Sequence, residues 1–271
     1  MNIFDYFQFS FIQRGFIVGI IIALLGAILG HFLVLKKLAL IGHALSHIAY
    51  MSIAISIVFF QQSLWVNLMF ASIAALLIEW LVRKNPQQSD VIIGVLSSIG
   101  VAIGTIVITT NPNQNVTVEQ FLFGSILLLR HIDMMSIIVL GVLIVAFVIL
   151  FYEDLATLTF DRDYGRVIGL KSYWLDATLA LLASWLIILG IRGVGALMIS
   201  SFIMFPTLIA SPLVKSFKGA LLLGTMVSLV VFVIGFLLSL GFDWPTGSTI
   251  IVVYGVVWML TFFIQPLRRL R

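Results

Sequence analysis

Long stretches without a charged residue constrain the fold of this chain more than any other feature. Hydrophobic residues make up 62% of the sequence and charged residues only 10%, whereas a soluble domain is about half apolar and a quarter charged. Because a helix needs about 20 apolar residues to cross a bilayer, we expect an all-α, polytopic helical membrane protein with one domain, residues 1–271. No Asp, Glu, Lys or Arg occurs in 38–78, 91–118, 134–152, 177–191, 193–214, 219–242 or 244–267.

The apolar runs predict about eight or nine transmembrane helices. A shorter apolar piece, residues 120–129, is too short to cross and is expected to be a half-helix or re-entrant element. Asp5 and Arg14 precede a run of full span length, which does not fit a cleavable signal peptide. The expected spans are 13–35, 38–60, 64–82, 90–110, 132–152, 173–191, 193–213, 217–241 and 247–266.

The basic residues set the expected orientation. Lys and Arg gather after alternate spans, and the positive-inside rule makes that side cytoplasmic. Arg192 and Arg14 are exceptions to this pattern. The positive charges are scattered rather than clustered, which argues against a nucleic-acid partner. The chain has no cysteine, so thiolate metal ligands and disulfides are excluded.

Two histidines, His43 and His47, lie within the uncharged run 38–78. A spacing of four residues places both imidazoles on one face of a helix, and His47 would lie near mid-membrane. Neutral imidazole is a good ligand for zinc and other first-row metals, so the pair predicts a metal site. The alternative is that each ring forms a hydrogen bond between packed helices. Asp90, which can also act as an N-cap of its helix, is a further candidate ligand.

Two enzyme motifs are incomplete in this chain. A zinc protease needs Glu directly after the first histidine, and here that residue is Ala44. "GRVIGLKS" (165–172) resembles the end of a phosphate loop, but three residues rather than four separate its glycines and Leu170 precedes the lysine. We therefore expect a protein that catalyses no reaction itself and holds no permanent cofactor.

Other polar and helix-breaking residues have both structural and functional interpretations. Pro206, beside Thr207, removes a helix hydrogen bond, which either exposes carbonyls to a transport pathway or only kinks the helix. Glu79 lies four residues before Arg83 and is expected to pair with it. His31 and His131 lie near span ends and are expected at the membrane interface.

Residues 153–172 form the one long polar connection in a chain with short loops. Such a segment is usually functional or a docking surface. The stretch "DYGRVIG" (163–169) predicts a short amphipathic turn of helix.

Five landmarks, taken in order, resemble the permease subunit of the zinc/manganese ABC importer family. The resemblance covers nearly the whole chain. The landmarks are Lys36-Lys37 followed by "LALIGHALSH" (38–47), "SDVIIG" (89–94), "LFG" (122–124), "VGALMISSFIMFPTLIA" (194–210) and "DWPTG" (243–247).

The resemblance implies a homodimeric permease in the bacterial cytoplasmic membrane that imports Zn²⁺ or Mn²⁺. Its partners would be cytoplasmic ABC ATPase subunits, which use the ATP, and an extracytoplasmic metal-binding protein, with membrane lipid around it. The segment 160–171 would be the coupling helix that contacts the ATPase. The residues assigned to that contact are Asp161, Arg162, Asp163, Gly165, Arg166 and Gly169.

This chain departs from the family pattern at the first landmark. The family has Asp where this chain has His43, and some zinc-type relatives have a histidine where this chain reads Ser97-Ser98. A change from carboxylate to imidazole favours zinc over manganese. Two alternatives remain open: an ion-coupled secondary transporter that uses the histidines as a proton relay, and a structural membrane subunit.

Overall fold

The computed structural model describes residues 8–111, 124 and 131–269, and within these ranges the chain is helical and contains no strand. Eight of the described helices are long and apolar enough to cross a membrane. The membrane-length helices are α2 (Ser10–Leu35), α3 (Ile41–Phe59), α4 (Leu64–Lys84), α5 (Ser89–Thr109), α7 (His131–Leu150), α10 (Ser172–Val194), α12 (Phe217–Phe242) and α13 (Thr246–Arg269). The shorter helices are η1 (Pro86–Gln88), α8 (Tyr152–Phe160), α9 (Arg162–Val167) and α11 (Ala196–Ala210). The expectation for 120–129 lies outside the described residues except for Gly124.

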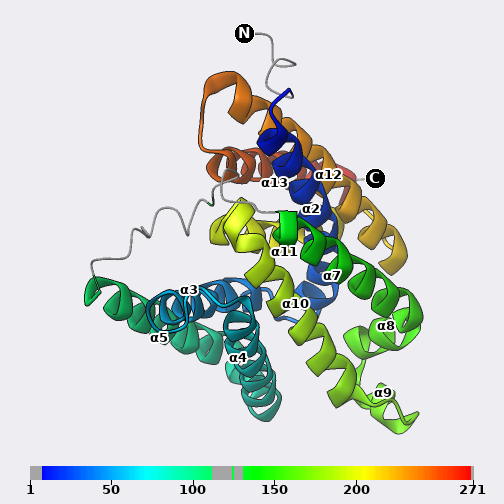
Figure 1. Cartoon of the computed structure of the whole chain (residues 1–271). Coiled ribbons are helices and arrows are strands. Elements are labelled where there is room, and N and C mark those ends of the chain that lie inside the picture. Colours follow the sequence, from blue (N-terminus) through cyan, green and yellow to red (C-terminus); the bar gives the residue numbers. More distant parts are fainter. Residues whose placement is uncertain (1–7, 112–123, 125–130, 270–271) are drawn as a thin grey trace.

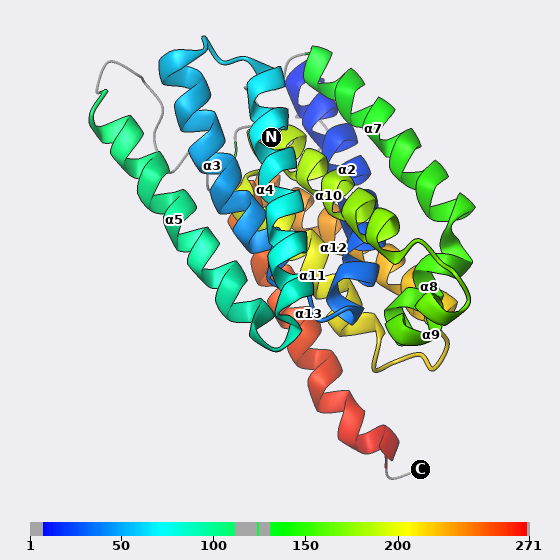
Figure 2. The ribbon, with the colours of Figure 1, turned by 90° about the horizontal axis from the view of Figure 1, so that it is seen from below.

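The helices form one bundle whose two flanks carry different elements (Figures 1 and 2). Helices α3, α4 and α5 form one flank, and α7, α8 and α9 form the opposite one. Helices α10 and α11 lie between them, and α10 is the most buried of the candidate spans in the described chain. A displacement of α10 would therefore move helices of both flanks.

The seventh expected span, 193–213, is not a full span in the structure. Helix α10 continues to Val194, the chain breaks at Gly195, and α11 has only 15 residues. At 1.5 Å per residue this helix is about 22 Å long, shorter than a hydrocarbon core of about 30 Å. Gly195 has φ +83° and ψ 157°, a backbone region that is open essentially only to glycine.

Small residues let α11 pack directly on α2. A Cβ added at Gly26 would lie 2.8 Å from the Cβ of Phe202, and one at Gly30 would collide with the Ile203 carbonyl group. Close approach through glycine is a common way to pack helices in membranes. This packing holds the short helix in the centre of the bundle, where its N-terminal end at Gly195 is buried rather than exposed to lipid.

Candidate functional site

The two histidines of α3 converge on each other. The Nε2 atoms of His43 and His47 lie 3.0 Å apart, and the rings meet edge to face with centroids 4.3 Å apart. One nitrogen must carry the proton and the other must accept it, so the pair as it stands contains at least one neutral imidazole. The sequence prediction that both rings share a face is confirmed.

The spacing of the two nitrogens suits a shared metal ion. Ligands at about 2.05 Å in a tetrahedral site lie about 3.3 Å apart, using the usual Zn–N distance. The observed 3.0 Å needs only a small opening of the rings to reach that value. Replacing the shared proton with a divalent ion therefore requires little rearrangement of α3.

Helix α5 supports the backbone behind His47. A Cβ added at Gly100 would lie 3.2 Å from the His47 carbonyl oxygen, and one at Gly104 would lie 2.6 Å from the Tyr50 ring. On another face of α3, the Ser46 hydroxyl lies 3.2 Å from that of Ser200 in α11. The histidine turn is thus fixed by two neighbouring helices.

The pair is incomplete as a metal site within the described part of this chain. No group of three or more His, Cys, Asp or Glu residues able to hold a metal occurs among the described residues, so Asp90 does not join His43 and His47. Asp90 lies exposed in the first turn of α5, whose N-cap is Gln88. The N-cap expectation for Asp90 is therefore wrong by two positions.

The histidine face of α3 is open in the single chain. His43 is exposed and His47 is partly buried. A polar side chain is costly where it faces hydrocarbon, so polar residues of a span normally face the bundle interior or a water-filled cavity. An open imidazole pair at membrane depth therefore calls for a polar neighbour on this face.

The expected coupling segment contains two helices, α8 and α9. Asp161 is the N-cap of α9, and its carboxylate accepts hydrogen bonds from the backbone N–H groups of Asp163 and Tyr164. Arg166 pairs with Asp163 at 3.3 Å on the exposed surface. Gly165 is buried against Leu158. The predicted short helix is confirmed, and Asp161 and Gly165 shape it.

The outer face of α9 carries apolar side chains that the sequence analysis did not single out. The exposed fractions of Val167, Tyr164 and Ile168 are 85%, 57% and 51%, and that of the neighbouring Phe160 is 73%. We call these four residues the α9 apolar face. Their 3–4-residue spacing was visible in the sequence, but it was hidden among the apolar residues of the whole chain. Adjacent exposed apolar side chains of this size are typical of an interaction surface.

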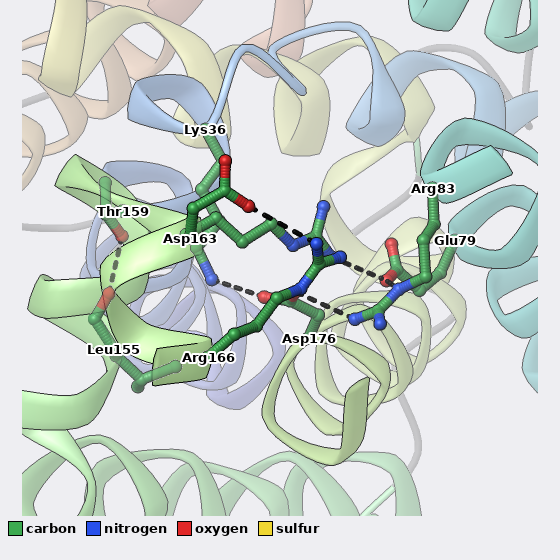
Figure 3. A network of polar contacts seen from close by, with 9 residues as sticks. Lys36, Glu79, Arg83, Leu155, Thr159, Asp163, Arg166 and Asp176 are labelled. Carbon is green, nitrogen blue, oxygen red and sulfur yellow. Dashed lines mark hydrogen bonds and ion pairs between the residues drawn. The ribbon is translucent and has the colours of Figure 1, made fainter. Parts of the chain in front are cut away.

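Behind α9 lies a cluster of ion pairs, which we call the Asp176 cluster: Lys36, Glu79, Arg83, Arg162 and Asp176. The Oδ1 atom of Asp176 lies 2.6 Å from Lys36 Nζ, and its Oδ2 atom lies 2.5 Å from Arg162 Nη2 and 3.4 Å from Arg83 Nη2. Glu79 Oε1 lies 3.3 Å from Arg83 Nε and 3.4 Å from Arg162 Nη2. Figure 3 shows Glu79 and Arg83 of α4 converging with Lys36, at the end of α2, and with Asp176 of α10.

The cluster confirms one predicted pairing and contains a second that the sequence did not indicate. Glu79 pairs with Arg83 as expected. Lys36 and Asp176 were not predicted to meet, because 140 residues separate them. Arg162, assigned to the ATPase contact, is the residue that joins α9 to α4 and α10. Three groups of basic residues expected on the cytoplasmic side therefore meet at one end of the bundle.

Pro206 lies inside α11, and Thr207 next to it is buried. The proline cannot donate to the carbonyl four residues earlier, at Phe202. The Thr207 hydroxyl has no hydrogen-bond partner among the described residues. Helix α11 is continuous through Pro206, so the proline removes one backbone hydrogen bond without ending the helix.

The structure corrects the expectation for His31, agrees with that for His131 and explains the position of Arg192. His31 is not interfacial: it is buried, with its ring 4.6 Å from that of Phe217. His131 begins α7 and is exposed, in agreement with its expected place. Arg192, the exception to the charge rule, lies in the last turn of α10 and pairs with buried Asp133 at 3.6 Å. An ion pair therefore accounts for a cation at this end of the bundle.

Comparisons with known proteins match the whole architecture. The model of the ABC 3 transport family matches residues 8–265. The manganese import system permease protein ScaB of Streptococcus gordonii is 26% identical over 97% of this chain and 94% of its own. The high-affinity zinc uptake system membrane protein ZnuB of Buchnera aphidicola subsp. Schizaphis graminum is 26% identical over 94% and 98%. The structure of PsaBC from Streptococcus pneumoniae superimposes with a TM-score of 0.86 over 99% of this chain and 97% of the matched chain, at 24% identity.

Proposed function

Because the chain belongs to the ABC 3 transport family, we propose that it is the membrane-spanning permease of an ATP-driven importer of divalent transition metal. It works in the bacterial cytoplasmic membrane, with separate ATPase subunits and an extracytoplasmic metal-binding protein. The observation that carries this proposal is the convergent pair of imidazoles, His43 and His47, on a membrane-length helix. A pair of neutral nitrogen ligands can take a metal ion from the outer side and release it when the helices move.

A second copy of the chain completes the metal site. The histidine face of α3 is open, and the described residues hold no third ligand of the His, Cys, Asp or Glu type. A two-fold axis beside this face would bring four imidazoles together, which satisfies a tetrahedral ion. It would also remove the exposed imidazoles from lipid. The cargo would then pass between the two copies, beside α3 and α5.

Cysteine cross-linking tests this arrangement without background, because the chain has no cysteine. A single His43→Cys substitution should cross-link two copies when membranes are oxidised. Leu222→Cys, on the exposed surface of α12, is the matched control and should remain monomeric on a denaturing gel. Equal cross-linking of both variants would argue against an interface at α3.

Zinc is the cargo that the ligand set favours. Imidazole nitrogen suits zinc better than manganese, which prefers oxygen ligands. The relatives ScaB and ZnuB are named for manganese and zinc, respectively. A His43→Asp substitution supplies one oxygen ligand, and it should move the preference of uptake toward manganese. Accumulation of both metals in cells that carry each variant measures this preference.

Helix α9 is the contact for the ATPase. Its apolar face is exposed on a helix expected on the cytoplasmic side, with Arg166 and Asp163 beside it. Val167→Glu with Ile168→Glu should abolish co-purification of the ATPase while the permease still inserts. Lys215→Glu, at another exposed basic position, is the control and should retain the ATPase.

Metal uptake by the complete transporter tests the function itself. Vesicles that contain the permease and its ATPase subunits, with the binding protein outside, should accumulate zinc only when ATP is inside. The His43→Ala/His47→Ala variant should lose uptake. Ser98→Ala on α5 should not, because the Ser98 hydroxyl donates to the Gly94 carbonyl of its own helix. Uptake driven by a proton gradient without ATP would favour a secondary transporter. Normal uptake by the double variant would show that the histidines only pack between helices and do not bind the metal.

A further inference from the structure

Asp176 holds cations from three other helices on one carboxylate. Lys36 ends α2, Arg83 lies in the last turn of α4 and Arg162 begins α9, and each contacts an Asp176 oxygen. The carboxylate itself belongs to α10. The side chain of Asp176 is 8% exposed and that of Glu79 is 5% exposed. At this depth ion pairs are screened far less than at a surface, so the loss of one partner is felt by all the others.

Helix α9 has few other connections to the spans. It packs mainly on α8, with a small contact to α10. A cavity of about 490 Å³ lies between the α8–α9 corner and the spans, lined among others by Lys36, Glu79, Arg162 and Asp176. Besides the short covalent connection 168–171 to α10, the ion pairs of the Arg162 guanidinium join α9 to α4 and α10 among the described residues. The same cavity leaves α9 room to move.

We propose that the Arg162–Asp176 pair is the joint that passes movement of α9 to the transmembrane helices. This inference rests on the proposed docking of the ATPase at α9. When the ATPase displaces α9, the ion pair between Arg162 and Asp176 transmits the displacement to α10. Asp176 is also paired with Lys36 and Arg83, so the displacement would reach α2 and α4 as well.

The route from this joint to the metal site is made of packed helices. Helix α10 packs on α2, α3, α4, α7 and α11, and α3 carries His43 and His47. Packed helices transmit small displacements because interiors are not freely compressible. Asp176 is thus a positioning residue: it contacts no metal, and it fixes where α9 stands relative to the spans.

The test compares ATP hydrolysis with metal uptake in the same vesicles, using the complete transporter and radioactive zinc. Asp176→Asn keeps the shape of the side chain and removes its charge. Arg162→Ala removes the other half of the joint at a side chain that is 34% exposed, so it is the variant that is easier to fold. Both should keep ATP hydrolysis and lower zinc taken up per ATP by about tenfold, a usual size for coupling between sites. Lys215→Gln, at an exposed charge outside α9 and the Asp176 cluster, should leave the ratio unchanged.

Cross-linking distinguishes a mechanical joint from a general structural role. In the Arg162→Cys/Asp176→Cys variant the ratio should be low when the thiols are free. A short reagent that bridges the two thiols should restore the ratio, because it reconnects α9 to α10 without restoring any charge. A merely destabilised protein would gain no coupling from this bridge.

Two outcomes overturn the inference. One is a normal ratio in Arg162→Ala, and the other is a low ratio in the cysteine variant that bridging does not raise. Failure of the proposed docking shows separately, as normal ATPase binding by the Val167→Glu/Ile168→Glu variant. Loss of ATP hydrolysis together with uptake in both charge variants would also overturn the inference, because the pair would then be needed for ATPase activity rather than for transmission.

Discussion

Gly100 of α5 lies directly against the backbone of His47, so close that an added methyl group would sit 3.2 Å from the His47 carbonyl oxygen. This distance is shorter than ordinary carbon–oxygen contacts, and the same methyl group would lie 3.1 Å from the backbone nitrogen of Ile48. The absence of a side chain at Gly100 therefore sets the position of the histidine turn relative to α5.

We expect Gly100→Ala to lower zinc uptake severalfold by pushing α5 away from α3. Gly94→Ala is the matched control, because it lies on the same helix and its added methyl group meets nothing within 4 Å. In a helix the change from glycine to alanine alone stabilises by about 0.5–1 kcal/mol, so the control should be at least as stable as the parent. Uptake rates and thermal unfolding of both variants in detergent check this, and equal uptake would contradict it.

Single alanine substitutions should separate the two histidines. Each imidazole supplies one nitrogen to the proposed site, and loss of a ligand should cost at least about tenfold in apparent metal affinity, since even residues that only orient a ligand cost 10–100-fold. We expect His47→Ala to be the more damaging, because His47 is the histidine that the family pattern retains. The concentration of zinc at half-maximal uptake measures the effect. Identical values for both variants and the parent would exclude ligation.

Uptake should weaken as the external pH falls through the histidine range. A free imidazole has a pKa of about 6.5, and only the neutral form binds metal, so protons and zinc compete for the same nitrogens. Two imidazolium ions with nitrogens 3.0 Å apart would also repel each other. The concentration of zinc at half-maximal uptake should therefore rise at low pH, and the pH response should shrink in His43→Ala, which keeps only one of the two rings. A response that is unchanged in that variant would place the titrating group elsewhere.

The spans could be predicted from the sequence because their cause is local. A bilayer excludes charge, so the charge-free runs mark the membrane-length helices to within a few residues. The i, i+4 rule likewise predicted the His43–His47 and Glu79–Arg83 pairs.

The features that could not be predicted depend on contacts between distant segments. The run 193–213 is as apolar as a span, and only the break at Gly195 makes α11 short. His31 stands near a helix end but is covered by Phe217, 186 positions later. Asp176 lies at the start of an expected span, and only the packing of α2, α4 and α9 around it brings its three cations together. Burial of this kind is a property of the packed bundle, not of a sequence window.

Pro206→Ala should restore the missing hydrogen bond to the Phe202 carbonyl and straighten α11. If the missing hydrogen bond serves the transport cycle, uptake should slow about tenfold while the protein becomes no less stable, because helix-interior proline costs about 3 kcal/mol. Thr207→Val, which removes the buried hydroxyl without a partner among the described residues, keeps the proline and should not slow uptake to the same extent. Initial uptake rates and thermal unfolding of both variants check the expectation. Unchanged kinetics in Pro206→Ala would mean that the proline only bends the helix.

The pair of Asp133 and Arg192 should stabilise the opposite end of the bundle from the Asp176 cluster. Asp133 is 2% exposed and joins α7 to α10 through Arg192. Arg192→Met leaves a buried carboxylate without this cation, so we expect a loss of about 3–5 kcal/mol in the free energy of unfolding. Adding Asp133→Asn should recover most of that loss, because the buried charge disappears. Lys215→Met, at an exposed position, controls for the lost positive charge. Thermal unfolding in detergent measures all four proteins, and a double variant as unstable as Arg192→Met would show that the two residues do not act as a pair.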